Sequence, residues 1–100
     1  MAASQALFIT DNASKYLQQL CKHWSHRFTV DFTAESGWVD FGGGERMEAV
    51  ADRDGLRLVA YVQSAESSLA ELETVIGDHL ARFAFREEVR LTWQPLESGK

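Results

Sequence analysis

The spacing of hydrophobic residues changes from helical to strand-like within one segment, from residue 64 to residue 93. Apolar residues first recur every three or four positions, as on one face of a helix, at Leu69, Leu72, Ile76, Leu80 and Phe83. Apolar and polar residues then alternate, as in a strand with one buried face, at Val89, Leu91 and Trp93. The segment therefore predicts a helix capped by Ser64 and, after a charged corner over 86–88, a strand over 89–93.

The N-terminal part of the chain predicts a further strand and helix. The short apolar run over residues 6–10 favours a strand. Thr10, Asp11 and Asn12 are residues whose side chains accept hydrogen bonds from free amides, so a helix is expected to begin there and to end near residues 25–27. The apolar face of this helix is predicted to consist of Ala13, Tyr16, Leu17, Leu20 and Trp24.

Four strands are predicted between the helices, because alternating apolar positions are separated by turn residues. The first two are expected over 28–32 and 38–41, and the fourth over 56–62. The third shows its strand pattern over 45–49 and is expected to end at residue 52. Gly42–Gly44 and the pair Asp54-Gly55 mark tight hairpin turns, since glycine adopts positive φ without steric cost. The three glycines lack the Lys-Ser/Thr and the following helix of a phosphate-binding loop, which favours the hairpin interpretation.

This order of elements, β-α-β-β-β-β-α-β, predicts an α+β two-layer sandwich. Both helices are expected to pack on one face of a mostly antiparallel six-stranded sheet. Short hairpins place the second to fifth strands side by side, and right-handed crossovers favour the order 6-1-5-4-3-2, with the first strand parallel to neither neighbour. The topology resembles that of TATA-binding-protein-like folds, which implies no DNA binding. One domain is expected over residues 1–96, with a frayed tail over 97–100.

Composition narrows the classes of partner. Fifteen acidic and ten basic residues give a net charge of −5, and the basic residues are scattered, which argues against nucleic-acid binding. The single cysteine, Cys21, cannot form an internal disulfide, which suits a reducing cytosol. The N-terminus lacks a signal-peptide pattern, and no apolar run approaches the ~20 residues needed to cross a bilayer. We therefore expect a cytoplasmic protein with neither a nucleic-acid nor a membrane partner.

The three histidines are the candidate metal ligands. His23 and His26 stand three apart, so their side chains are neighbours on a helix, and His79 on the other helix could supply a third imidazole for Zn²⁺ or Fe²⁺. If the helices pack side by side, His79 is expected to approach His23. The set could be completed by Asp78, Glu73 or Cys21. The alternative is structural, with His26 solvated and His79 bonded to a backbone carbonyl.

The sheet face opposite the helices is the candidate interaction surface. Two aromatic residues and two valines are expected on it, more than a solvated sheet face needs: Trp38, Val50, Val59 and Tyr61. They predict a contact with a second copy of the chain or with another protein. The alternative is an ordinary mixed surface with scattered apolar groups.

Catalytic signals are weak. Cys21 beside a histidine would suggest a thiol nucleophile, but it lies on the predicted core face, where cysteine behaves as a small hydrophobe. The acidic pairs Glu71/Glu73 and Glu87/Glu88 are interpreted as solvated surface. No nucleophile–base pair or cofactor motif is visible, so no catalytic or cofactor-binding residue is assigned and an autonomous enzyme is the least favoured hypothesis.

Several segments resemble a known bacterial family: residues 14–20, Lys22-His23 with His26-Arg27, Leu72-Glu73, and residues 76–87. Over almost its whole length the chain resembles the "domain of unknown function 2218" family of small cytosolic proteins, most specifically in His-Leu-x-Arg-Phe-x-Phe-Arg-Glu from His79 to Glu87. The resemblance implies no assigned activity. Some members are fused to siderophore-interacting flavin reductases, which implies a link to iron handling. We therefore predict a non-enzymatic interaction or accessory domain, and as the alternative a histidine-based metal-binding protein linked to iron or siderophore metabolism.

Overall fold

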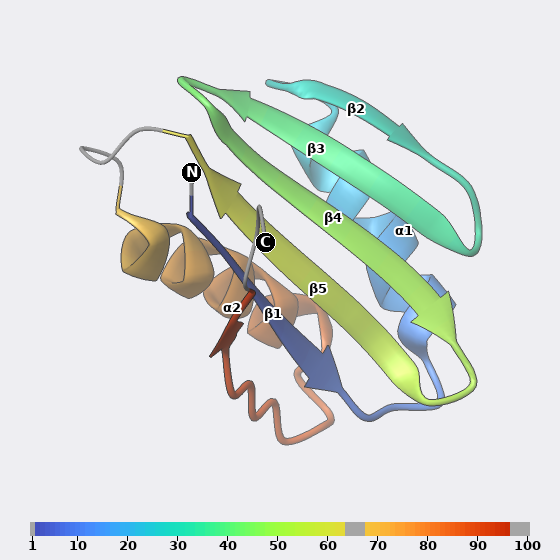
Figure 1. Ribbon diagram of the computed structural model, residues 1–100. Helices are drawn as coiled ribbons and strands as arrows, with labels where there is room; N and C mark the ends of the chain where they lie inside the picture. The colour runs from blue at the N-terminus through green and yellow to red at the C-terminus, as the bar shows by residue number, and fades with distance from the viewer. Residues whose placement is uncertain (1, 64–67, 97–100) are drawn as a thin grey trace.

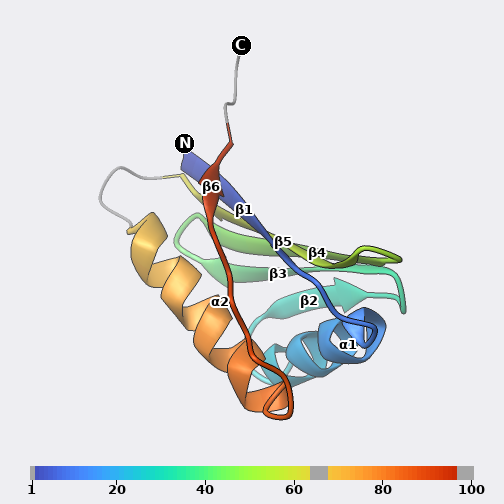
Figure 2. The same ribbon diagram turned by 90° about the horizontal axis from the view of Figure 1, so that it is seen from below.

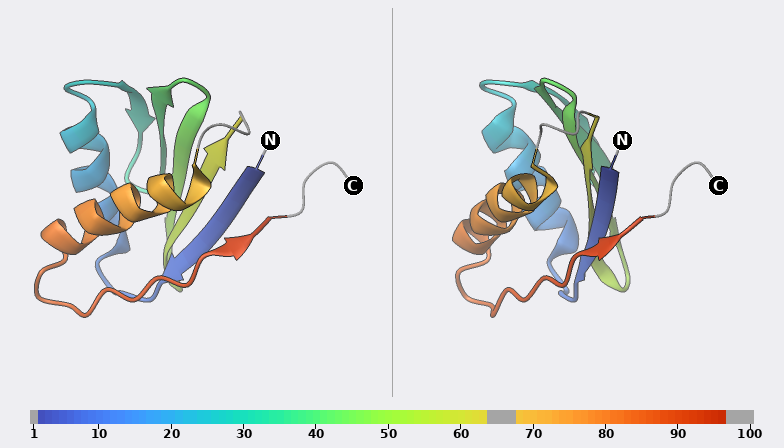
Figure 3. Two further views of the ribbon diagram at one scale, coloured as in Figure 1. Left: turned by 90° about the vertical axis from the view of Figure 1, so that its left-hand side faces the viewer. Right: turned by 60° about the vertical axis from the view of Figure 1, so that its left-hand side comes forward.

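The computed structural model describes residues 2–63 and 68–96. These residues form two helices and six strands: β1 (Ala2–Phe8), α1 (Ala13–Trp24), β2 (Thr29–Phe32), β3 (Ser36–Gly42), β4 (Glu45–Asp52), β5 (Gly55–Val62), α2 (Leu69–Phe83) and β6 (Gln94–Pro95). Both helices lie on one face of the sheet, as the edge-on views show (Figures 2 and 3). The predicted two-layer α+β fold is confirmed.

The strand order in the sheet is β2-β3-β4-β5-β1-β6, which is the predicted order counted from the other edge. All of its pairings are antiparallel, so the N-terminal strand runs opposite to both of its neighbours. β1 pairs with β5 over its whole length, from Ala2 opposite Val62 to Phe8 opposite Leu56 (Figure 1). β1 therefore lies beside β5, at the edge of the meander that β2, β3, β4 and β5 form.

The hairpin turns depend on glycines with positive φ. Gly43 and Gly44 have φ values of 63° and 83° and form the two-residue turn between β3 and β4, so the hairpin interpretation of the glycine run is confirmed. The register shifts between Asp40 and Gly42, which makes this hairpin irregular. At the next turn Gly55 has φ 136°, and a Cβ there would lie 2.2 Å from the carbonyl oxygen of Phe8. Only glycine therefore fits where β5 begins beside β1.

The core lies between the helices and the inner face of the sheet. The helical spacing detected in the sequence corresponds to the buried faces: Leu17 and Leu20 of α1, and Ile76 and Leu80 of α2, are fully buried. They pack in one cluster with fully buried residues of the central strands, namely Val39, Met47, Leu56, Leu58 and Ala60. Alternate residues on β3, β4 and β5 consequently face away from the helices.

Two predicted strands differ from the structure. The first strand spans Ala2–Phe8, and Ile9, expected within it, is 79 % exposed. Pairing with β5 sets these bounds, although alanine and serine have little strand propensity. The last strand is confined to Gln94–Pro95, because residues 89–93 alternate in burial without pairing to a strand.

The start of α2 and the predicted C-terminal tail can be compared with the structure only in part. α2 begins at Leu69, and its N-cap Ser68 accepts a hydrogen bond from the Glu71 amide at 3.1 Å. Ser64, the predicted cap, and the predicted frayed tail over 97–100 lie outside the described residues.

Candidate functional site

His23 and His79 lie side by side on the helical layer. His23 is in the last turn of α1 and His79 is in the second half of α2, and their ring centres are 5.2 Å apart. Two larger aromatic rings flank the pair: Trp24 lies 5.0 Å from His79, and Phe83 lies 5.8 Å from His23, centre to centre. Because both helices bury their apolar faces in the same core, the edges of those faces bring the two imidazoles together, as the spacing predicts.

A backbone hydrogen bond fixes the tautomer of the neutral His79 ring. Its Nδ1 lies 2.8 Å from the carbonyl oxygen of Val75, one turn earlier in α2. A carbonyl oxygen only accepts, so Nδ1 carries the hydrogen, and in the neutral ring Nε2 keeps a free lone pair. The backbone contact expected of a structural histidine is therefore present, and it leaves one nitrogen available to a ligand.

His23 is exposed and surrounded by positive charge. Its pKa is lowered from the usual 6.5, first by the loss of some water around the ring and then by the charges of His79, Arg82, His26 and Arg27. The lowered pKa favours the neutral ring near pH 7, and a neutral imidazole can accept a hydrogen bond or bind a metal.

The structure brings together two of the three predicted histidines. His26 follows the C-cap Ser25 and is exposed. Within residues 2–63 and 68–96, no group of three or more histidine, cysteine, aspartate or glutamate side chains is arranged to hold a metal ion. Of the three predicted ligands, only His23 and His79 therefore lie close together.

The four residues of the predicted interaction surface all lie on the face of the sheet that points away from the helices. Trp38 is on β3, Val50 on β4, and Val59 and Tyr61 are on β5. Trp38, Val59 and Tyr61 are half-buried by their neighbours, whereas Val50 is 42 % exposed. Figure 1 views this open face directly, with both helices behind the sheet.

Charged side chains separate the apolar residues of the open face. Arg46 stands directly opposite Tyr61, and its guanidinium lies 4.9 Å from the centre of the Trp38 ring. It also forms an ion pair with Glu48 at 3.5 Å. The pKa of Tyr61 is raised, first by burial and then by the charge of Glu48. Sequence reasoning missed Arg46, although the alternation along β4 places it on the same face as Val50.

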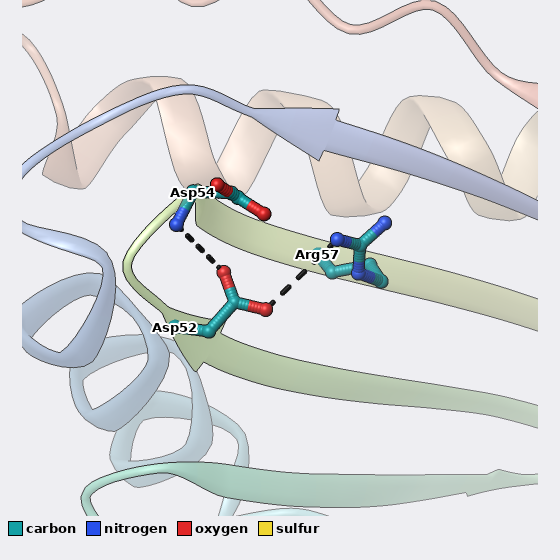
Figure 4. Close-up of polar contacts among 3 residues, drawn as sticks. All are labelled: Asp52, Asp54 and Arg57. Carbon is teal, nitrogen blue, oxygen red and sulfur yellow. Dashed lines mark hydrogen bonds and ion pairs between the residues drawn. The ribbon is translucent and has the colours of Figure 1, made fainter.

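The same face continues to the hairpin between β4 and β5. Asp52 accepts a hydrogen bond from the Asp54 amide at 2.9 Å, and its other carboxylate oxygen lies 3.9 Å from the Arg57 guanidinium (Figure 4). At the opposite end, beside the glycine turn, is an open hollow of about 580 Å³. Its lining residues are Asp40, Gly42, Gly43, Gly44, Glu45, Arg46, Glu48, Tyr61 and Gln63.

The carboxylate of Glu87 is a hydrogen-bonding centre that sequence reasoning missed. Its Oε2 accepts from Thr10 Oγ1 and Asn12 Nδ2, both at 3.0 Å, and from the hydroxyl of Tyr16. These donors lower the pKa of Glu87, with the Tyr16 hydrogen bond the largest cause. The interpretation of Glu87 as solvated surface omits these contacts, since its side chain is half-buried and accepts three hydrogen bonds. Glu73 is also half-buried and accepts from Ser4 Oγ at 2.5 Å.

Cys21 is excluded as a nucleophile by its surroundings. Its side chain has no exposed surface, and burial raises the pKa of the thiol to about 11. The reactive thiolate is therefore neither populated near neutral pH nor accessible to a substrate.

The fold and these side chains define an α+β domain with helices on one face of its sheet and a mixed polar and aromatic surface on the other. The family described as "Uncharacterized protein conserved in bacteria (DUF2218)" matches residues 5–94, and the chain belongs to this family, as its sequence segments predict.

Among solved structures, the chain is similar to the NMR structure of PA4090 from Pseudomonas aeruginosa. The two are 39 % identical with a TM-score of 0.79, over 98 % of this chain and 100 % of that one. No curated protein matches the chain. Among the described residues, neither helix is long and apolar enough to cross a membrane.

Proposed function

We propose that the protein is a non-enzymatic interaction domain that forms a homodimer through the open face of its sheet. The observation that carries this proposal is the cluster of Trp38, Arg46 and Tyr61 on adjacent central strands of that face. Tryptophan, arginine and tyrosine are the residue types that most often dominate the energy of protein–protein interfaces. Here the arginine lies over one ring and opposite the other, so the three form one contact surface.

The charges of the open face favour a second copy of the chain as the partner. A twofold interface brings the same surface together from both copies, so it needs both signs of charge on one surface. Arg46 and Glu48 are neighbours on this face, as are Arg57 and Asp52, with separations of 3.5 and 3.9 Å within each pair. Each pair is exposed enough to exchange partners across a twofold axis.

The face is also large enough for a stable dimer. The Cα atoms extend over 35 × 28 × 22 Å, and the sheet spans most of the molecule in the face-on view (Figure 1). A specific interface buries about 800 Å² on each partner. A contact centred on Arg46 and covering β3, β4 and β5 would reach this size.

Sedimentation velocity over a range of protein concentrations tests the proposal. The wild type is expected to dimerise, and the Trp38→Ser/Tyr61→Ser double variant is expected to be a folded monomer. Arg46→Glu is a second variant that removes no apolar contact from the core, and it should also weaken the dimer. The matched control is Phe85→Ser, since Phe85 is 73 % exposed and lies outside the sheet.

Circular dichroism shows whether each variant remains folded. A wild type that stays monomeric at high concentration contradicts the homodimer, as does a dimer that persists in both open-face variants.

A further inference from the structure

We propose that His23 and His79 form a binding site for one divalent transition-metal ion of the zinc and copper class. The two imidazoles supply the protein ligands, and water or an anionic co-ligand occupies the remaining positions. The site lies on α1 and α2, which cover one face of the sheet (Figure 3), whereas Trp38 and Tyr61 lie on the other face. It is therefore independent of the proposed dimer contact.

The separation of the rings matches shared coordination. Imidazole nitrogens bind zinc at ~2.0–2.1 Å, and two imidazoles on one tetrahedral ion have ring centres roughly 5 Å apart. The ring centres of His23 and His79 are 5.2 Å apart, with the ring planes at 46°. Direct face-to-face stacking would need nearly parallel planes. The distance between the ring centres is therefore compatible with one nitrogen of each ring binding a common ion.

The backbone hydrogen bond of His79 is also one that metal-binding histidines make. Histidines that bind metals usually donate the hydrogen of the other ring nitrogen to a carboxylate or a backbone carbonyl, which fixes the ring and the tautomer. His79 makes this contact from Nδ1 to the Val75 carbonyl at 2.8 Å. Nε2 is then the atom left to bind the metal, and helix α2 holds the ring in place without an ion.

Aromatic side chains restrict the rings on the side of the core. Trp24 is 4 % exposed and lies 5.0 Å from His79, while Phe83 is half-buried and lies 5.8 Å from His23. An apolar shell of this kind limits ring movement and water access around a bound ion. The exposed side of His23 leaves an approach from solvent.

The available ligands determine which ions fit. Imidazole suits Zn²⁺, Cu²⁺ and Ni²⁺, whereas Ca²⁺ and Mg²⁺ require several oxygen ligands. Among the described residues, no group of three metal-binding side chains surrounds the pair, so the ion keeps open positions.

Isothermal titration of untagged, metal-stripped protein with ZnCl₂ or CuCl₂ tests the site. The wild type is expected to bind one ion per chain. His23→Ala and His79→Ala should each weaken binding at least ~10-fold, because a loss of even an outer-shell partner costs that much. The matched control is His26→Ala, which removes an exposed histidine three positions from His23 and should leave the affinity unchanged.

Four further results test the proposal. Cobalt absorption spectra should show a band of nitrogen-coordinated Co²⁺ in the wild type that the His23→Ala/His79→Ala double variant lacks. Equal affinity of the wild type and this double variant would overturn the site, and so would loss of binding in His26→Ala alone. The Arg46→Glu variant should bind the metal like the wild type, so that failure of the dimer and failure of the metal site are distinguishable.

Discussion

The hydroxyl of Tyr16 donates a hydrogen bond to the carboxylate of Glu87, which lies 71 residues further along the chain. Thr10 and Asn12 donate to the same oxygen from the loop before α1. One carboxylate therefore ties the start of α1 to the segment that follows α2. The interaction also raises the pKa of Tyr16, since ionised tyrosine could no longer donate to Glu87.

Replacement of Tyr16 by phenylalanine should lower the thermal midpoint by ~5 °C. The substitution removes one donor to Glu87 and leaves the aromatic packing against Phe8 intact. Differential scanning calorimetry provides the measurement. Tyr61→Phe is the matched control, because Tyr61 lies on the open face and should change the midpoint less. An equal shift in the two variants would contradict the role assigned to the Tyr16 hydroxyl.

The stability of the protein should fall in acid through Glu87. Because the folded-state pKa lies below the ordinary value of 4.5, the unfolded state binds the proton first as the pH falls. The stabilising contribution is complete above about pH 4.5 and is lost as the pH falls through the folded-state pKa. Urea titrations between pH 3 and pH 7 should show this loss in the wild type and in Glu88→Gln, whose side chain is exposed. A wild-type slope retained in Glu87→Gln would argue against it.

Two glycine-to-alanine substitutions should have opposite effects. A Cβ at Gly37 would lie 2.7 Å from Phe32 Cβ and 2.9 Å from Cys21 Sγ, so Gly37→Ala should destabilise the fold by ~1–3 kcal/mol. At Gly77, inside α2, a Cβ would meet Leu91 Cδ1 at an ordinary 3.5 Å. Gly77→Ala should therefore stabilise the protein by roughly 0.5–1 kcal/mol. Chemical denaturation measures both, and a shared sign would refute the comparison.

The thiol of Cys21 should be protected in the folded protein. Burial raises its pKa to about 11 and removes it from solvent, so modification at pH 8 requires unfolding. We expect a thiol reagent such as Ellman's reagent to react slowly with the native protein and rapidly in concentrated urea. Similar rates in the two conditions would place Cys21 at an accessible surface.

The sequence predicts the fold where periodic patterns coincide with packing. Leu72, Ile76 and Leu80 repeat at helical spacing and are buried, and the hairpin turns leave few alternatives for the order of the central strands. It predicts β1 and β6 less well. Ala2–Gln5 become a strand only because β5 is beside them, and residues 89–93 alternate through packing on the core edge without pairing to a strand.

Some residues of the candidate sites are likewise predictable from the sequence pattern, and others are not. The approach of His79 to His23 follows from two helical faces that share one core, so it is predictable once the helices are placed. The position of Arg46 over Trp38 also follows from alternation and register. Glu87 carries no such signal, because three donors converge on it from a loop without periodicity. Its role depends on tertiary structure alone.

The position of β1 between β5 and β6 has a consequence for synthesis on the ribosome. Translation delivers the chain from its N-terminus at ~5–20 residues per second. β1 therefore emerges before β2 to β6, whereas the strands that pair with it end at Val62 and Pro95. Strands β2 to β5 can pair with one another as they emerge, and β1 then pairs with the edge strand β5 of the meander that they form. A nascent chain that ends before residue 84 contains all four strands of the meander but lacks Glu87, so Tyr16 cannot yet form its hydrogen bond.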